Sequence, residues 1–324
     1  MSPLYYLFGG GALLYFGAEW FVGGASALAR ALRTPQVIVG LTVVAYGTSA
    51  PEIVVGIQAA SAGHGSVALG NVLGSNIANI GLILALAVLV RPAKVDASFR
   101  HRELPMLLGS SLLLPYFFHD DNLGVWEAFA LLVAAAAYTG AMIKSARSSV
   151  EMAANLVHVE ATSEAAEESG APHSLGAGRA ALVAALGLGV MLLGGTFFID
   201  GSIAVARILG MSDRMVGLTI VAIGTSFPEL VTSVIAARRG HSDLAIGNVV
   251  GSNIFNSTLC LGAAGLFGTV NTPFSTIAFD LLAMLGMTAA LAFLVRRERI
   301  ILRREGASLL AAFILFTLWT IARG

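Results

Sequence analysis

Two glutamates stand in the middle of long apolar runs, and nearly the same residues precede each of them. Glu52 ends the sequence GTSAPE and Glu229 ends the sequence GTSFPE. Burying a carboxylate in an apolar membrane segment has a large free-energy cost, so such a residue indicates a functional site by default. Hard cations such as Ca²⁺ prefer oxygen ligands, of which Ca²⁺ takes about 6–8. Neither motif contains the cysteine or histidine that softer metals favour. The two motifs therefore predict an oxygen-lined cation site.

The two glutamate motifs belong to a longer repeat. Residues 40–80 align with residues 217–257 without a gap, at an offset of 177 positions, and 24 of the 41 aligned positions are identical. Positions four apart lie on one face of a helix. Each copy carries further polar side chains at this spacing, namely Ser75 with Asn79 and Ser252 with Asn256.

A proline precedes each glutamate directly. Proline lacks an N–H and clashes with the carbonyl four residues back, so Pro51 and Pro228 should kink or unwind their helices. Carbonyl oxygens freed at membrane depth are tolerated only inside protein or against a cavity. The expected result is a local cluster of carboxylate, hydroxyl and carbonyl oxygens, which includes Thr48 beside Glu52 and Thr225 beside Glu229.

The composition is that of an integral membrane protein. Of the 324 residues, 56% are apolar and only 12% are charged, against about 25% charged in a typical soluble domain. The net charge of zero gives no indication of nucleic-acid binding. The sequence predicts an all-α, polytopic protein with ten transmembrane helices, near residues 4–29, 36–60, 67–90, 103–118, 123–143, 178–206, 214–237, 244–268, 275–295 and 306–322.

The basic residues predict the orientation of these spans. Sixteen of the 19 Lys and Arg residues fall in connections that follow odd-numbered spans. The positive-inside rule therefore places those connections in the cytoplasm and both termini outside a cell membrane. The offset between the repeat copies contains five spans, an odd number, so the second copy should run inverted. We expect a first five-helix repeat (1–143), a cytoplasmic linker (144–177) and a second, inverted repeat (178–324), with the binding site between the repeats.

The repeated motifs closely resemble the paired alpha-repeats of the calcium/cation antiporter superfamily, particularly its sodium/calcium exchanger branch and prokaryotic relatives. The matching residues are GTSAPE with GNVLGSNIAN in the first copy and GTSFPE with GNVVGSNIFN in the second. The resemblance implies a secondary-active antiporter, not an enzyme, that exchanges Ca²⁺ for Na⁺ by alternating access. Its partners would be the lipid bilayer and the two transported ions. No cofactor and no protein partner are expected.

The resemblance also implies roles for individual residues. Glu52 and Glu229 would bind Ca²⁺ or Na⁺ in alternation, and the carbonyls of Thr48 and Thr225 would complete the Ca²⁺ site. Asn79 and Asn256 would lie in the central plane with the glutamates. The Na⁺ ligands would come from Ala45, Thr48, Ser49, Glu52 and Ser75 in one half and from Ala222, Thr225, Ser226, Glu229 and Ser252 in the other. Some relatives, including potassium-dependent ones, carry an aspartate in place of Asn256. The amide here argues against potassium dependence. The first and sixth spans correspond to the family's sliding helices.

The sequence is compatible with three alternatives. The same fold could exchange Ca²⁺ or Na⁺ for protons, because buried carboxyl groups can titrate. A cation channel is disfavoured because both halves lie in one inverted chain rather than in a ring of subunits. An intramembrane enzyme is disfavoured because neither a His-Glu-x-x-His pattern nor a nucleophile motif accompanies the acids.

Glu19 lies in the first span and aligns with Thr196. Because it has no acidic twin, we expect a structural role for it before a role in an access path.

Overall fold

The computed structural model describes residues 3–32, 34, 36–95, 97–160, 176–208, 222–297 and 300–323, most of which are helical. The elements up to residue 160 are α1 (Pro3–Ala31), α2 (Gln36–Val39), the π-helix η1 (Gly40–Val44), α3 (Ala45–Thr48), α4 (Ala50–Ser61), α5 (Gly65–Ala78), the π-helix η2 (Asn79–Leu84), α6 (Ala85–Val90), β1 (Ala93–Lys94), α7 (Ala97–His101), α8 (Glu103–Phe117), β2 (Asn122–Leu123) and α9 (Val125–Glu160). The later elements are α10 (Ala177–Ile208), α12 (Ala222–Thr225), α13 (Phe227–Arg238), α14 (Ser242–Phe255), the π-helix η4 (Asn256–Cys260), α15 (Leu261–Phe267), β3 (Val270–Asn271), α16 (Phe274–Arg297), β4 (Ile300–Ile301) and α17 (Arg303–Arg323).

Many of these helices are long and apolar enough to cross a membrane. Within the described ranges, seven spans meet this description, and an eighth is formed if the bent pair 40–48 and 50–61 is one span. This supports a multi-pass, all-α membrane protein. Helix α8 has 15 residues, fewer than the roughly 20 that a perpendicular crossing needs. Residues 214–221, at the start of the seventh expected span, lie outside the described residues. The total of ten spans therefore stays a prediction.

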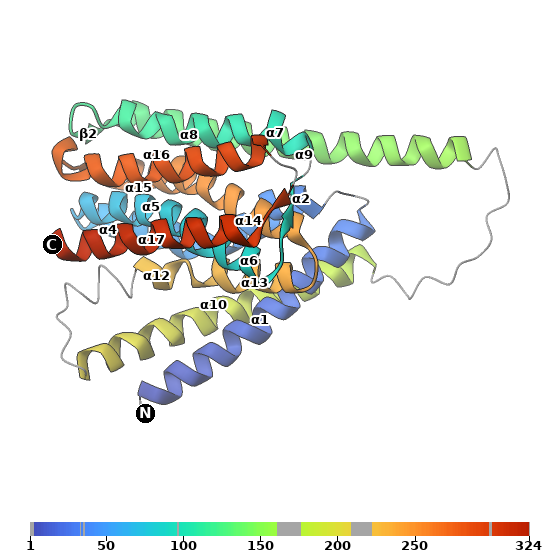
Figure 1. Ribbon diagram of the computed structural model, residues 1–324, viewed down its shortest axis with the longest axis horizontal. Helices are drawn as coiled ribbons and strands as arrows, with labels where there is room; N and C mark the ends of the chain where they lie inside the picture. Colours follow the sequence, from blue (N-terminus) through green and yellow to red (C-terminus); the bar gives the residue numbers. More distant parts are fainter. Residues whose placement is uncertain are drawn as a thin grey trace.

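The repeat segments form the centre of the molecule. The apolar window of the run 242–267 is 89% buried and that of the run 65–90 is 78% buried, whereas that of α17 is only 17% buried. Figure 1 shows α8, α9 and α16 along one side of this centre, and α1 and α10 crossing it obliquely on the other. The repeat helices are thus covered by the other helices, which expose more of their own surface.

Two pairs of short strands connect the halves crosswise. Strand β1 pairs antiparallel with β4, and β2 pairs antiparallel with β3. The repeat offset of 177 relates β1 to β3, and it relates β2 to β4 within one residue. Each strand therefore pairs with a strand of the other half, and the two pairings are reciprocal.

Helices α1 and α10 pack through a glycine seam, with a spacing of seven residues on each helix. At every seam glycine, an added Cβ would lie within 3.0 Å of the backbone of the facing helix. Such glycines allow two helix backbones to approach closely. The seam consists of Gly10, Gly17 and Gly24 on α1 and of their twins at the repeat offset, Gly187, Gly194 and Gly201, on α10.

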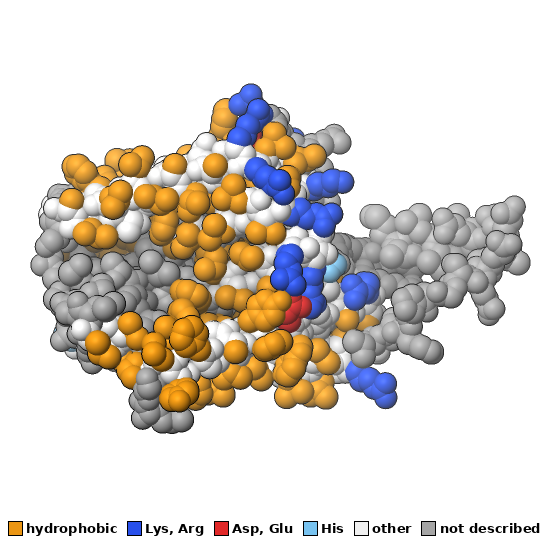
Figure 2. Space-filling view, turned by 60° about the horizontal axis from the view of Figure 1, so that its bottom comes forward, with side chains coloured by type: hydrophobic (Ala, Val, Ile, Leu, Met, Phe, Trp, Pro, Cys, Tyr) orange, Lys and Arg blue, Asp and Glu red, His pale blue; other side chains and the backbone are white. Residues whose placement is uncertain are grey.

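The surface separates into an apolar zone and a basic band. In Figure 2, apolar side chains cover most of the visible face, while Lys and Arg side chains gather toward one end. This distribution is typical of a protein whose basic rim lies at a membrane interface. Helix α9 passes the expected end of the fifth span at residue 143 and continues to Glu160. Part of the expected linker 144–177 is therefore helical, and its residues 161–175 lie outside the described ranges.

Candidate functional site

Each glutamate motif forms a helix break at a serine. Helix α3 ends at Thr48 and α4 begins at Ala50, and the helix axis bends by 49° between them. The intervening Ser49 has φ −81° and ψ 5°, and Ser226, between α12 and α13, has φ −88° and ψ 7°. These values lie in the sparsely populated bridge region. Each proline is at the start of the second helix piece, where its missing N–H leaves no helical bond unmade.

The breaks place both carboxylates at helix N-termini. Glu52 lies in the first turn of α4, and Glu229 lies in the first turn of α13. The exposed backbone N–H groups and the helix dipole favour negative charge at this position. Both side chains are buried, with exposed fractions of 1% and 0%. The breaks therefore provide local stabilisation for two carboxylates that have no access to bulk water.

The serines at the breaks bond to the glutamates crosswise. Ser49 Oγ donates to Glu229 Oε1 at 3.1 Å, and Ser226 Oγ donates to Glu52 Oε1 at 3.0 Å. The repeat offset converts one of these bonds into the other. The two motifs thus form one joint cluster in which each half holds the carboxylate of the other.

The second oxygen of each carboxylate is left for another partner. Among the described residues, neither Glu52 Oε2 nor Glu229 Oε2 has a hydrogen-bond partner. The described ion pairs involve neither glutamate. Ser49 and Ser226 each stand three residues before a glutamate, so the crossed bonds bring the two carboxylates into one cluster. A buried charge requires a counter-charge or a full set of hydrogen bonds, so a cation between the carboxylates fits this arrangement.

Two asparagines hold the broken helices in place through hydrogen bonds. Asn71 Oδ1 accepts a hydrogen bond from Thr225 Oγ1 at 3.3 Å, and its Nδ2 donates to the Glu52 carbonyl at 3.4 Å. Asn248 repeats this clamp, accepting from Thr48 Oγ1 at 3.1 Å and donating to the Glu229 carbonyl at 3.5 Å. Each asparagine therefore ties a threonine of one half to a glutamate backbone of the other.

A second group of asparagine amides connects the two halves through hydrogen bonds. Asn79 Nδ2 donates to Asn253 Oδ1 at 2.8 Å, and Asn253 Nδ2 donates to the Asn76 carbonyl at 3.2 Å. Asn79 begins the π-helix η2, and Asn256 begins the π-helix η4, where it accepts a weak bond from Cys260 Sγ at 3.4 Å. Asn79 Oδ1 and Asn256 Nδ2 have no hydrogen-bond partner in the described part of the chain. Both amides therefore retain polar atoms that are buried and unpaired.

The remaining residues expected in the site lie around this cluster. Ser75 Oγ is 3.0 Å from Ser226 Oγ, and the Ser252 hydroxyl on α14 is buried without a hydrogen-bond partner among the described residues. Ala45 begins α3, and its carbonyl accepts the Ser49 N–H at 3.0 Å. Ala222 begins α12, and only its place in that helix is described. The described residues contain no group of three or more His, Cys, Asp or Glu that could hold a metal.

Comparison with known proteins identifies the family. The family model for sodium/calcium exchanger proteins matches residues 2–144 and 179–322. The chain belongs to the sodium/calcium exchanger family. The sodium/calcium exchanger MaX1 of Methanosarcina acetivorans is 32% identical over 325 residues, which cover 93% of each chain. The inner membrane protein YrbG of Escherichia coli is 34% identical over 258 residues, 78% of this chain and 76% of that protein.

The structural comparison agrees with the family assignment. A solved structure of the sodium-calcium exchanger NCX_Mj, soaked with 2.5 mM Na⁺ and 0.1 mM Ca²⁺, matches with a TM-score of 0.82 at 28% identity. The match covers 97% of this chain and 98% of that one. As a member of this family, the protein is a multi-pass membrane transporter and works as a cation antiporter.

Sequence reasoning on this exchanger missed the clamp residues. Asn71 and Asn248 lie in the repeated motifs but received no role, and Asn76 and Asn253 were overlooked in the same way. All four are identical between the repeat copies and are buried. Two aligned amides in apolar helices are the signal that could have found them, because a buried amide requires partners.

Proposed function

We propose that this exchanger moves Ca²⁺ across the cell membrane in exchange for Na⁺, at a site formed by Glu52 and Glu229. The observation that carries the proposal is the pair of crossed bonds from Ser49 to Glu229 and from Ser226 to Glu52. These bonds bring two buried carboxylates into one cluster while leaving an oxygen of each without a partner. A combined charge of −2 suits one Ca²⁺ or two monovalent ions in competition for the same oxygens.

The ligands around the carboxylates differ between the two ions. The carbonyls of Thr48 and Thr225 complete the Ca²⁺ site, and Asn79 and Asn256 flank it. Hydroxyl and carbonyl oxygens supply the Na⁺ positions, which is chemically reasonable because both ions are hard and prefer oxygen. The proposed Na⁺ ligands beside the glutamates are Ala45, Thr48, Ser49 and Ser75 in one half and Ala222, Thr225, Ser226 and Ser252 in the other.

The site lies between two inverted five-helix repeats, residues 1–143 and 178–324, which together give ten spans. The reciprocal pairings of β1 with β4 and β2 with β3 support a two-fold relation between the halves. Both termini lie outside, and the linker 144–177 is cytoplasmic, because this orientation puts the basic band inside. Inverted repeats of this kind place ion sites near the membrane midplane.

Alternating access arises when α1 and α10 slide across the repeat helices. The glycine seam supports movement of these two helices as one body, since their backbones are in direct contact. Covalent crosslinking of either helix to the central helices should abolish exchange. Undiminished transport after crosslinking would contradict this part of the proposal.

Purified protein in sealed vesicles provides the test of the counter-ion. Radiolabelled Ca²⁺ uptake is measured with an outward Na⁺ gradient and, separately, with a pH gradient alone. The proposal predicts uptake that requires Na⁺ and saturates with Ca²⁺. Uptake that follows the pH gradient without Na⁺ would instead establish proton coupling, and linear, unsaturable flux would establish a channel.

A further inference from the structure

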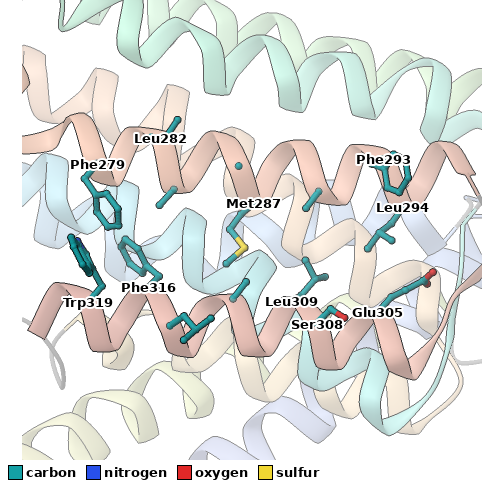
Figure 3. A pocket seen from close by; sticks show the side chains of 15 residues that line it. Phe279, Leu282, Met287, Phe293, Leu294, Glu305, Ser308, Leu309, Phe316 and Trp319 are labelled. Atoms are coloured by element: carbon teal, nitrogen blue, oxygen red, sulfur yellow. The ribbon is translucent and has the colours of Figure 1, made fainter. Parts of the chain in front are cut away.

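A lipid-facing cavity lies between α16 and α17, away from the ion site. It has a volume of about 700 Å³, within the range of about 300–1,000 Å³ typical of small-molecule sites. Its lining is almost entirely apolar, with Glu305 and Ser308 as exceptions. Figure 3 shows Phe279, Phe316 and Trp319 at one end of this groove and Glu305 with Ser308 at the other. Phe279 stacks on Phe316 and contacts Trp319, so aromatic rings close the first end.

The opposite end of the groove lies next to four arginines in the chain, although the only charged residue in its lining is Glu305. Helix α16 ends with Arg296 and Arg297, and α17 begins with Arg303 and Arg304. The Glu305 carboxylate accepts the backbone N–H of Leu302 at 2.8 Å, so it caps the start of α17. From Glu305 to Trp319 the groove follows α17 for about 21 Å at 1.5 Å per residue, which is comparable with the length of an acyl chain. An apolar slot of this length suits an acyl chain, and the arginines that lie near its end in the chain suit an anionic headgroup.

We propose that an anionic phospholipid binds between α16 and α17. One acyl chain lies in the groove, and the phosphate lies near the arginines at the end of α16 and the start of α17. Each arginine near the surface contributes about a fivefold preference for anionic over neutral lipid. The bound lipid fills space that the two helices leave open. The lipid therefore keeps α16 and α17 apart. Helix α16 packs on α8, and helix α17 packs on α6.

Trp319 provides a direct probe of this site. In a variant with Trp20→Phe and Trp126→Phe, Trp319 is the only tryptophan, and its fluorescence is measured in vesicles that contain a minor fraction of lipid with brominated acyl chains. We expect brominated phosphatidylglycerol to quench more strongly than brominated phosphatidylcholine at equal fraction. Gly286→Leu should remove the difference, because Gly286 lines the groove and a Cβ there meets no atom within 4 Å.

Two further variants distinguish lipid binding in the groove from the general effect of adding a side chain to a membrane helix. Gly109→Leu on α8 also adds a side chain where a Cβ meets nothing within 4 Å, and it should leave the preference intact. Arg296→Gln with Arg297→Gln should reduce the preference without filling the groove. Equal quenching by the two lipids, or a preference that survives Gly286→Leu, would overturn the proposal. Loss of quenching by both lipids in a dimeric protein would show that a second copy covers the groove.

Within the described ranges, one ion-pair contact between α1 and the central helices occurs in one half without a counterpart in the other. Glu19 on α1 pairs with Arg239 and, at 3.7 Å, with Arg238 at the end of α13. Arg238 also lies over the Tyr15 ring at 6.0 Å, and a Cβ on Gly23 would meet Arg239 within 3.0 Å. These contacts form an ionic latch between α1 and the central helices.

At the repeat offset, the latch residues align with residues that cannot form an ion pair. Glu19 aligns with Thr196, whose hydroxyl bonds to Leu192 of its own helix, and the arginines align with Ser61 and Ala62. If inverted repeats exchange conformations between the two access states, as the proposed function requires, symmetric contacts favour neither state. We infer that the Glu19–Arg239 latch breaks this symmetry and favours the access state in which it is formed.

Distances between spin labels test the latch separately from transport. Labels at Leu4→Cys on α1 and Leu318→Cys on α17, both exposed, are placed in a Cys260→Ser background. We expect two distance populations whose ratio responds to Na⁺ and Ca²⁺. Glu19→Gln should lower one population by up to about fivefold, the upper value for a partly exposed ion pair. The charge swap Glu19→Arg with Arg239→Glu should restore it, and Thr196→Val should change nothing.

The outcomes distinguish the latch from the transport mechanism. Two populations that Glu19→Gln leaves unchanged would overturn the latch alone. A single population under all ion conditions would contradict alternating access as well as the latch.

Discussion

Ser226 lies within hydrogen-bonding distance of Glu52, 3.0 Å from Oγ to Oε1, although 174 positions separate them in the chain. The bond from Ser49 to Glu229 is its counterpart at the repeat offset. Neither repeat copy can build this site by itself, because each carboxylate takes its serine donor from the other copy.

The serines at the helix breaks should affect Na⁺ more than Ca²⁺. In the proposed site their hydroxyl oxygens are Na⁺ ligands only, so Ser49→Ala and Ser226→Ala should each raise the Na⁺ concentration for half-maximal exchange about tenfold, a typical effect for a contact to a charged group. The Ca²⁺ dependence should shift less, because Ca²⁺ loses no direct ligand and only the bond that orients one carboxylate is removed. Ion titrations of vesicle uptake measure both quantities. Ser110→Ala, a buried serine that bonds only within α8, is the control, and equal shifts for the two ions would argue against separate ligand sets.

The asparagine clamps should stabilise the fold around the site. Asn248→Ala leaves the Thr48 hydroxyl and the Ser233 hydroxyl without their amide partner. Buried groups that lose a partner typically lower the free energy of unfolding by about 1–3 kcal/mol. Thermal melting of the purified protein in detergent measures this loss. Asn122→Ala, at an exposed position of β2, should melt like the parent, and a similar melting temperature for Asn248→Ala would refute the clamp.

The glycine seam offers a test with adjacent residues. A Cβ on Gly10 would lie within 3.0 Å of the Phe198 backbone, whereas a Cβ on Gly9 meets nothing within 4 Å. Gly10→Ala should therefore force α1 away from α10 and reduce both thermal stability and exchange, and Gly9→Ala should be close to neutral. If both variants transport at the parental rate, close contact along the seam is not needed for movement.

The sequence was sufficient to predict the helical membrane fold and the family, because a repeated acid in an apolar run is rare and costly. It was less informative about geometry. Thr48 and Glu52 stand four positions apart, a spacing that predicts one shared helical face. The break at Ser49 instead puts them on separate helices, and Thr48 bonds to Asn248 from the other half. Long-range partners of this kind depend on how the halves pack, and local spacing carries no information about that packing.

Buried polar atoms were likewise hard to assign from spacing alone. The family resemblance implies that Asn79 lies in the central plane with the glutamates, and in the structure its amide donates to Asn253 Oδ1. The pairing of Glu19 with Arg239 spans 220 positions, and no sequence pattern connects them. What the sequence did provide was the offset of 177, which predicts a twin for every contact and makes an unmatched one, such as the latch, recognisable.

Ca²⁺ uptake by the glutamate variants tests the shared site most directly. Glu52→Gln and Glu229→Gln keep the size and most hydrogen bonds of the side chain while removing one charge each. Each protein is reconstituted into vesicles, and radiolabelled Ca²⁺ uptake is driven by an outward Na⁺ gradient, with Glu127→Gln at the start of α9 as the control. Each site variant should fold and melt near the parent yet show no Na⁺-driven uptake, while the control should transport normally. Substantial Ca²⁺ uptake by either Glu52→Gln or Glu229→Gln would contradict a site that both carboxylates share.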